Sequence, residues 1–265
     1  MKKIVLVISH YNRIFQLRRT LESILLTKHD NLYVVVLDYN SDNKQELFNV
    51  ILDFPYIELL RIPKDPDNWY SCIVPYNMAL WWAIKKYKPE IVMMQDAECY
   101  HVGDVILHAN YNTDNNYIAY GTFSSDKETT FDPNFKDNIE NIAINNTKGA
   151  WGNGVLAWYN HPEHRRVGYG FCGAMSTENM VRINGFDERY KDGVAFGDDD
   201  FVKRIGIAKI NTIVTSYPFV VHQWHYDESY NIDENSLKKN RDLYSELASE
   251  TNCKAKHIYS PDFTL

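Results

Sequence analysis

Two carboxylates separated by one residue follow an apolar run in the first half of the chain. Residues 91–94 are apolar, Gln95 follows, and Asp96 and Glu98 come next. Carboxylate oxygens that face one point in a turn can bind a hard divalent cation such as Mg²⁺ or Mn²⁺. An isolated pair with this spacing is also common in solvated turns. It therefore indicates a metal site only if other parts of the chain supply further ligands.

A second group of acids lies at the start of a predicted helix. Asp198, Asp199 and Asp200 are adjacent, and apolar residues at helical spacing follow them. Acids at a helix N-terminus are stabilised by the helix dipole by about 0.3–1 kcal/mol each, so capping explains one or two of them. A third adjacent carboxylate adds repulsion. The cluster therefore favours a cation site, a general base or a hydroxyl-binding site.

Two histidines follow a strand-like run in the last third of the chain. His222 and His225 are three residues apart, after residues 212–221. A neutral imidazole can complete a metal site that carboxylates already hold, although a histidine at a strand end is often only a packed residue.

The elements that must bring these residues together alternate in type. Apolar runs at residues 4–9, 32–37, 56–62 and 91–94 predict strands, and helical spacing predicts helices over 14–25, 43–52 and 75–87. This order predicts a parallel, doubly wound α/β sheet, in which ligands bind at the carboxyl ends of the strands. Asp38 ends the second strand, so it either contacts a nucleotide or caps the following helix.

The remaining segments carry weaker signals. Residues 110–149 are rich in Asn, Asp, Thr and Lys and predict a long loop. Trp151 and Trp158 stand near glycines, where they could stack on a sugar or pack in a loop. Glycines at 168–173 would let the backbone approach a ligand. Residues 176–183 predict a helix capped by Ser176 or Thr177, and residues 236–249 predict a last helix.

Composition excludes several classes of function. The chain has 265 residues, 45% of them hydrophobic, and its 28 basic and 35 acidic residues give a net charge of −7. This charge argues against a nucleic acid or an anionic membrane as the main partner. No apolar run spans a membrane and no signal peptide is evident, which predicts a soluble cytoplasmic protein. The four cysteines form no CxxC pair and predict reduced, buried thiols. A P-loop and a Gly-rich dinucleotide motif are both lacking.

Taken in order, these motifs resemble the GT-A glycosyltransferases of the family 2-like type, and in particular the β-1,4-galactosyltransferase branch, over roughly residues 1–225. Residues 4–13 resemble the opening strand and loop, residues 35–42 resemble the second strand, and Asp96-Ala-Glu98 resembles the D-x-D motif. The most specific match joins Ile183-Asn-Gly-Phe186 to Gly197-Asp-Asp-Asp200, which is similar to the galactosyltransferase segment with I-N-G-F and G-G-E-D-D-D.

The resemblance implies a GT-A (Rossmann-like) α/β fold with a mostly parallel central sheet flanked by helices. One domain would cover residues 1–225, with a nucleotide-binding half at 1–109 and an acceptor and catalytic half at 150–225, and residues 226–265 would pack on it as an extension. The implied roles are nucleotide-sugar binding by His10, Tyr11, Asn12, Arg13, Asp38 and Asp96, metal binding by Asp96, Glu98, His222 and His225, catalysis by Asp198 or Asp199, and sugar contact by Trp151, Trp158, Gly173 and Asp200.

The implied activity is metal-dependent transfer of a sugar, with inversion, from a nucleotide diphosphate sugar to a hydroxyl of a glycan or glycoconjugate. The donor would be a UDP-sugar and the cofactor Mn²⁺ or Mg²⁺. Three positions depart from the pattern: Glu98 replaces an Asp, Gly197 replaces a Glu, and Cys172 replaces a Gly. Gly197 gives weight to an inactive glycan-binding module. A nucleotidyltransferase is disfavoured because its Gly-rich loop is absent.

Overall fold

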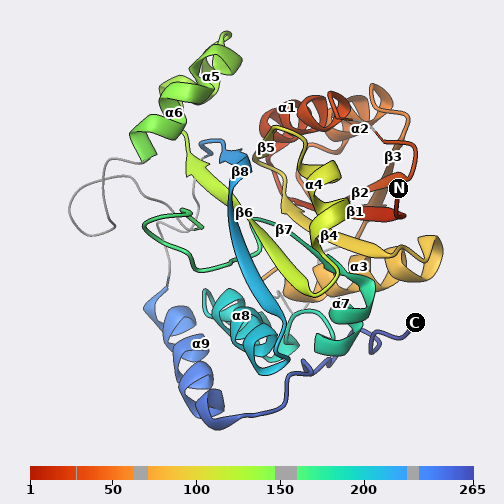
Figure 1. Cartoon of the computed structure of the whole chain (residues 1–265), viewed down its shortest axis with the longest axis vertical. Coiled ribbons are helices and arrows are strands. Elements are labelled where there is room, and N and C mark those ends of the chain that lie inside the picture. The colour runs from red at the N-terminus through yellow and green to blue at the C-terminus, as the bar shows by residue number, and fades with distance from the viewer. Residues whose placement is uncertain (28, 63–70, 147–159, 226–232) are drawn as a thin grey trace.

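The computed structural model describes residues 1–27, 29–62, 71–146, 160–225 and 233–265. Its centre is an eight-stranded sheet of order β3-β2-β1-β4-β7-β6-β8-β5, with helices on both faces (Figure 1). The elements of the first part are β1 (Ile4–His10), α1 (Ile14–Leu25), β2 (Leu32–Asp38), α2 (Lys44–Leu52), β3 (Ile57–Arg61), α3 (Ile73–Tyr87) and β4 (Ile91–Asp96). Each of the seven was predicted from sequence, with ends that differ by at most a few residues.

The second part builds the other half of the same sheet. Its elements are β5 (Cys99–Val102), α4 (Val105–Asn112), β6 (Asn116–Ser124), α5 (Lys127–Phe131), η1 (Phe135–Asn138), α6 (Ile139–Asn146), β7 (Cys172–Ser176), α7 (Thr177–Ile183), η2 (Glu188–Asp192), α8 (Gly197–Ile207), β8 (Asn211–His222), α9 (Glu234–Glu246) and η4 (Leu247–Ser249). Strands β1, β2, β3 and β4 pair in parallel, as do β6 and β8. Strand β7 is antiparallel to β4 and β6, and β5 is antiparallel to β8. The prediction of a mostly parallel sheet flanked by helices is confirmed.

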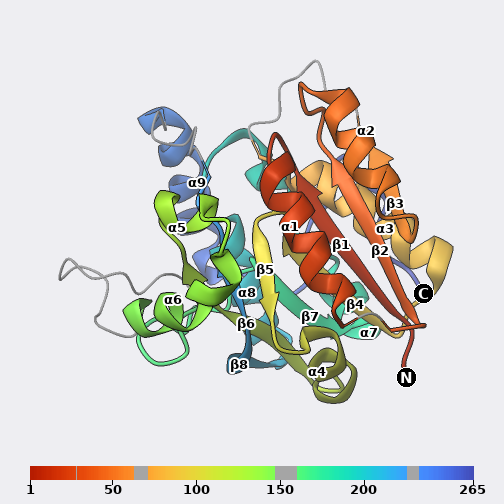
Figure 2. The same cartoon turned by 90° about the horizontal axis from the view of Figure 1, so that it is seen from above.

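Alternate residues of the central strands face different helix layers. Ile4, Leu6 and Ile8 of β1 belong to a buried cluster with residues of α1, α2 and α4. Val5 and Val7 point the other way, into a cluster with residues of α3, α7 and α8, and Figure 2 shows α1 and α3 on opposite sides of β1. Because both faces are covered, these strands read as continuous apolar runs, which is why the sequence reveals them.

The predicted loop over residues 110–149 is wrong for its described part. This segment contains β6, an interior strand whose Tyr117, Ile118, Ala119 and Tyr120 have no exposed surface. The phenol of Tyr120 donates a hydrogen bond to the carbonyl of Val105 at 2.9 Å, which satisfies its buried hydroxyl. Polar residues on both sides of the strand hide this apolar core from a reading of local composition. Strands β5 and β7 were also missed, because β5 has only four residues and β7 contains Gly173, a residue type that weakens a strand interior.

The two ends of α7 follow the predicted capping. The Ser176 hydroxyl accepts the N–H of Asn179 at the start of α7, and Asn184 ends that helix in the left-handed conformation, with φ of 60°. No helix among the described residues has the length and apolar character that crossing a bilayer requires. All four cysteines are free thiols, as predicted. The prediction that they are buried is wrong for Cys72, which is exposed, and for the half-buried Cys253.

The C-terminal segment returns to the chain at the Ile183-Asn-Gly-Phe186 motif. Asn184 donates a hydrogen bond from its side chain to the carbonyl of Ala255 at 2.9 Å and accepts the N–H of Phe263 at 2.7 Å. The buried carboxylate of Glu188 accepts the backbone N–H groups of Ile258 and Tyr259 at 2.6 and 2.7 Å. Part of this motif therefore holds the C-terminal segment in place.

Gly173 in β7 lies where no side chain fits. An added Cβ would lie 2.5 Å from the hydroxyl oxygen of Tyr117, which is itself buried. We expect Gly173→Ala to lower the free energy of unfolding by about 1–3 kcal/mol, because overpacking forces neighbouring atoms to shift. Denaturant unfolding of the purified chain measures this change.

Gly206 in α8 provides the matched control. A Cβ there would meet no atom within 4 Å. Gly206→Ala should leave the stability unchanged or raise it by up to about 1 kcal/mol, since alanine favours helix. If both substitutions changed the free energy of unfolding equally, the close contact described at Gly173 would be wrong.

Candidate functional site

The pairing of β5 with β8 brings a carboxylate and two imidazoles together at one edge of the sheet. Cys99 lies opposite His222 in this antiparallel pair, so Glu98 lies next to the end of β8. The Glu98 Oε1 atom is 3.4 Å from Nε2 of His222 and 3.1 Å from Nε2 of His225. One ligand atom from each of the three residues lies within 4.8 Å of the others. These side chains can therefore converge on one metal ion.

The protonation of this cluster suits a cation. Burial opposes ionisation of Glu98, but hydrogen bonds from His222 and His225 outweigh it and hold the pKa of Glu98 below its ordinary range. Burial also lowers the pKa of His222, although Glu98 opposes this shift. An ionised carboxylate and a neutral imidazole are the forms that bind divalent transition metals. The donor set therefore fits the predicted Mn²⁺, and Mg²⁺ is less suited to two nitrogen ligands.

Asp96 ends β4 beside these ligands. It lies opposite Ser9 in the sheet, and the Ser9 hydroxyl donates a hydrogen bond to its Oδ1 atom at 3.0 Å. Burial raises the pKa of Asp96 well above its ordinary value, and the negative charges of Glu98 and Asp198 raise it further. A cation bound close by would favour the ionised form of Asp96.

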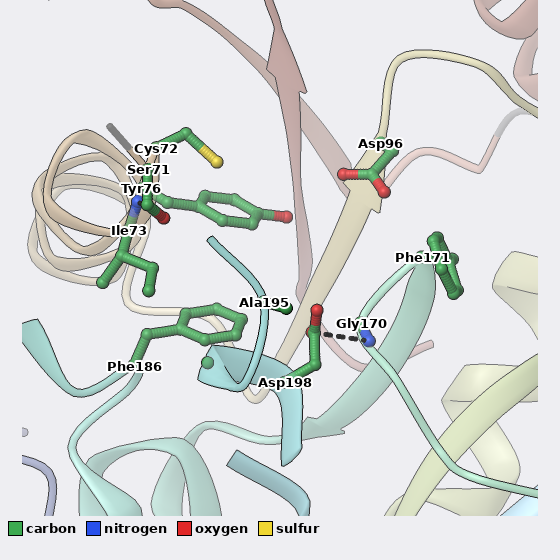
Figure 3. Close-up of a pocket in the computed structure, with 11 residues that line it drawn as sticks. Ser71, Cys72, Ile73, Tyr76, Asp96, Gly170, Phe171, Phe186, Ala195 and Asp198 are labelled. Carbon is green, nitrogen blue, oxygen red and sulfur yellow. Dashed lines mark hydrogen bonds between the residues drawn. The ribbon is translucent and has the colours of Figure 1, made fainter. Parts of the chain in front are cut away.

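Asp96 and Cys72 line two neighbouring cavities. The first cavity is formed by the β1–α1 loop and β2, with Tyr11, Arg13 and Tyr39 in its wall. The second is formed by α3, the segment before β7 and the start of α8, with Asp198 in its wall (Figure 3). Asp96 and Asp198 enter the second cavity from different sides. Asp96 therefore stands where the two cavities adjoin.

The predicted nucleotide contacts divide into two groups. His10, Tyr11, Arg13 and Asp96 line the first cavity. Asn12 adopts φ of 53° and exchanges two hydrogen bonds with Asp42, donating to its carboxylate at 2.8 Å and accepting its N–H at 2.9 Å. Asn12 thus joins the loop after β1 to the loop after β2, which gives it a structural role here.

Asp38 lies beneath the first cavity and has no exposed surface. Its carboxylate is 3.2 Å from Nδ1 of His10 and 3.3 Å from Nε of Arg61. Burial raises the pKa of Asp38, but bonds from His10 and Ser41 outweigh this and leave it below the ordinary value. In this arrangement Asp38 orients His10 through Oδ1, while its buried Oδ2 atom is ion-paired with Arg61 and accepts no hydrogen bond among the described residues.

The three adjacent acids of α8 point to different surroundings. Asp198 faces the second cavity, and its carboxylate accepts the N–H of Gly170 at 3.3 Å. Burial raises the pKa of Asp198 to about 6, the Gly170 hydrogen bond opposes the shift, and the charge of Asp199 adds to it. Asp199 accepts the hydroxyl of Tyr169 at 2.5 Å. Of the two candidate bases, only Asp198 is among the described residues that line the second cavity.

Asp200, the third acid, is paired inside the protein. Its carboxylate is 2.6 Å from Nε of Arg204, one turn along α8, and both side chains are almost fully buried. Arg204 also donates to the carbonyls of Ile183 and Gly185, each at 2.9 Å. Arg204 therefore holds α8 against the end of α7, Asp200 orients and neutralises it, and the predicted contact of Asp200 with a sugar would require this pair to separate.

Two further positions bear on the predicted sugar site. Gly173 lies in β7 beneath Tyr117, away from both cavities, whereas the nearby Gly170 lines the second one. A Cβ at Gly197 would lie 2.9 Å from the side chain of Ile73, which occupies the space beside the helix start. A larger residue at this position would require the end of the Ile73 side chain to shift. Trp151 and Trp158 lie outside the described residues.

Sequence reasoning missed several residues that form the cavity walls. Ser9, Cys72, Tyr76, Phe171 and Phe186 all line one or both cavities. Phe171 was near a glycine-rich signal, but Cys72 and Tyr76 come from the first turn of a helix whose pattern indicated only packing. Their position in the wall depends on how α3 lies on the sheet.

Comparisons with known proteins show likeness in structure but not in sequence. No family model matches the chain, and no curated protein matches it. The mannosyltransferase PcManGT from Pyrobaculum calidifontis, solved with GDP-Man and Mn²⁺, superposes with a TM-score of 0.56 at 14% identity, covering 98% of this chain and 66% of that chain. TarS from S. aureus gives 0.54 at 13% identity, covering 92% of this chain and 43% of that chain.

A third similar structure is glucosyl-3-phosphoglycerate synthase from Mycobacterium tuberculosis, with a TM-score of 0.50 at 11% identity, covering 96% of this chain and 81% of that chain. This chain thus spans less than two thirds of the length of PcManGT and of TarS. At such low identity the likeness shows the fold alone, and it confirms the prediction of a GT-A-like fold.

The raised pKa of Asp198 makes a prediction about stability. A carboxyl whose pKa is higher in the folded state binds its proton more tightly there, so its ionisation opposes folding. This opposition is complete above pH 6 and vanishes below the ordinary value of 3.8. In metal-free buffer at pH 8, we expect Asp198→Asn to raise the free energy of unfolding by up to about 3 kcal/mol, and the gain to shrink as the pH falls from 6 towards 4. Denaturant unfolding at several pH values measures it.

Asp187→Asn is the control with the opposite sign. Burial raises the pKa of Asp187, but hydrogen bonds from Arg189 and Lys256 outweigh it and lower the pKa. Its ionised form therefore stabilises the fold above the ordinary pKa, and Asp187→Asn should lower the free energy of unfolding at pH 8. If Asp198→Asn also lowered the free energy of unfolding at pH 8, the conclusion that the ionised form of Asp198 opposes folding would be wrong.

Proposed function

We propose that this chain is a metal-dependent glycosyltransferase that moves a sugar, with inversion, from a nucleotide diphosphate sugar to a hydroxyl of a glycan or glycoconjugate. The observation that carries the proposal is the position of Asp96 between two cavities. The metal-ligand set of Glu98, His222 and His225 lies on one side of it, and an acid suited to be a base, Asp198, lies across the second cavity. A donor and an acceptor can therefore meet beside Asp96.

The first cavity would hold the nucleotide of the donor. Tyr11 and Tyr39 in its wall offer aromatic faces for a base or ribose, and Arg13 offers a guanidinium to the diphosphate. Glu98, His222 and His225 would hold the metal ion next to this diphosphate. When bound, a divalent ion stabilises the negative charge that develops on the leaving group. Asp96 would contact the ribose or the metal ion.

The second cavity would hold the acceptor. Asp198 would accept the proton of the attacking hydroxyl while the acceptor oxygen bonds to the anomeric carbon. The bond from that carbon to the diphosphate breaks at the same time, and the nucleoside diphosphate leaves with the electron pair. Attack from the face opposite the leaving group inverts the anomeric centre. A base with a pKa near 6 is ionised at neutral pH and accepts a proton more readily than an ordinary Asp.

The nature of the donor is supported by fold neighbours. PcManGT was solved with GDP-Man and Mn²⁺, and a shorter TarS chain was solved with UDP. We favour a UDP-sugar, in line with the resemblance of the sequence motifs, and Mn²⁺ as the ion, in line with the two imidazole ligands. Asp198 lines the second cavity although Gly197 stands before it, which supports an active enzyme over an inactive sugar-binding module.

The donor and the metal can be tested together. We expect the purified chain to release UDP from at least one UDP-sugar, to lose this activity in EDTA and to recover it with Mn²⁺. Coupled detection of UDP across a panel of UDP- and GDP-sugars measures it. Glu98→Ala and His225→Ala should each weaken Mn²⁺ binding by more than about 100-fold, since the loss of an outer-shell partner alone costs about 10–100-fold.

The exposed Glu128→Ala serves as the control and should bind Mn²⁺ like the wild type. Metal-independent release of the nucleotide, or unchanged turnover in Asp96→Ala, would reject this assignment of the site. Release of pyrophosphate from a nucleoside triphosphate would instead indicate a nucleotidyltransferase.

The role of Asp198 gives a separate prediction. Asp198→Asn should lower kcat for transfer by about 10²–10⁴-fold, the usual contribution of a general base, with little effect on the affinity for UDP. In the wild type, kcat should fall as the pH drops below about 6, because Asp198 then becomes protonated. Asp199→Asn is the neighbouring control for the register. A larger loss in Asp199→Asn than in Asp198→Asn would transfer the role of base to Asp199.

A further inference from the structure

The turn that leads into α8 contains two consecutive residues in the left-handed conformation. Ala195 has φ of 60° and Phe196 has φ of 62°, and neither is glycine. For residues with a Cβ this conformation costs about 1–2 kcal/mol each, and it persists only where the surroundings impose it. Ala195, Gly197 and Asp198 all line the second cavity (Figure 3). The strained turn is therefore part of the wall that carries Asp198.

The contacts that impose this turn come from α9, which lies beside α8 (Figure 1). The side-chain amide of Asn240 donates hydrogen bonds to the carbonyl of Ala195 at 2.9 Å and to the carbonyl of Tyr190 at 3.1 Å. The N–H of Val194 donates to the carbonyl of Ser236 at 3.2 Å. Asn240 thus ties the left-handed turn to Tyr190 in the middle of η2.

This contact is buried, close and polar. Asn240 is only 3% exposed, and a Cβ on Gly193 would lie 2.4 Å from its Oδ1 atom. The buried residues of α9 are Ser236 and Asn240, and the ring of the half-buried Tyr244 lies 5.6 Å from that of Phe196, so the helix meets the turn through polar and aromatic contacts. A helix that packs through directional hydrogen bonds fixes the backbone it touches more narrowly than apolar contact alone would.

We propose that Asn240 is a positioning residue for Asp198: its amide locks the left-handed turn before α8 and thereby holds the base towards the acceptor cavity. The inference rests on the proposed function. Without the amide, Ala195 and Phe196 would relax to right-handed conformations, and the first turn of α8 would shift. Asp198 would then lose its geometry against Gly170. The nucleotide cavity belongs to the β1–α1 loop and β2, so binding of UDP should be kept.

The test compares Asn240→Ala with Asn235→Ala, an exposed asparagine of the same helix. For Asn240→Ala we expect faster hydrogen exchange of the Val194 and Asp200 amides and a fall in kcat of about 10-fold or more, because small misplacement of a reacting group costs that much. The affinity for UDP in the presence of Mn²⁺ should differ from that of the wild type by no more than about twofold, which is much less than the expected change in kcat. Asn235→Ala should match the wild type in all three. Thermal unfolding of each variant shows that it is folded.

A rescue variant separates positioning from general stability. Glycine adopts positive φ without steric cost, so Ala195→Gly added to Asn240→Ala should restore part of kcat. Unchanged exchange of the turn, unchanged kcat in Asn240→Ala, loss of UDP affinity in step with kcat, or the absence of rescue would each overturn the proposal. A wild type that turns over none of the nucleotide sugars would reject the proposed function and the catalytic role of Asn240 with it. The exchange rates would then still show whether Asn240 holds the turn.

Discussion

The architecture of the site depends on the burial of three carboxylates at one end of the sheet. The charges of Glu98 and Asp198 both act on Asp96, and burial makes the ionised form of each of the three acids less favourable. Each acid meets this constraint in its own way. Glu98 is bound by two imidazoles, Asp96 is favoured in its protonated form until a cation is near, and Asp198 keeps a raised pKa with one backbone N–H as its partner. The same constraint underlies the proposed roles of the cluster as a cation site and as the source of a general base.

Helix geometry explains how three adjacent acids in α8 can take different roles. Successive side chains of a helix point about 100° apart around its axis, so three adjacent side chains contact different neighbours. Asp198 therefore faces the cavity, Asp199 faces the hydroxyl of Tyr169, and Asp200 faces the interior, where Arg204 neutralises it. One turn of helix thus carries both the proposed base and the ion pair that fixes the helix in place. The Asp200–Arg204 ion pair fixes the orientation of α8, and it thereby also fixes the direction in which Asp198 points.

The C-terminal segment contacts α8 and the elements next to it. Asn184 and Glu188 hold its last residues through backbone hydrogen bonds, and α9 holds the turn before α8 through Asn240. Stability and function are therefore linked in this half of the chain. Residues far from the cavities support the backbone conformation from which the cavity wall is made.

The sequence by itself determined the elements of the first half, the acids at the start of α8, and the histidines at the end of β8. These features are local, because periodicity and capping record how one element is buried and where it ends. Only the tertiary structure decided that β6 is an interior strand and that Glu98 lies against His222 and His225. Only the tertiary structure decided, too, that Asp200 pairs inwards while Asp198 faces the cavity. These features depend on which distant elements pack together. Contacts between distant elements produce no periodic pattern in the sequence of either element, so they cannot be predicted from local sequence.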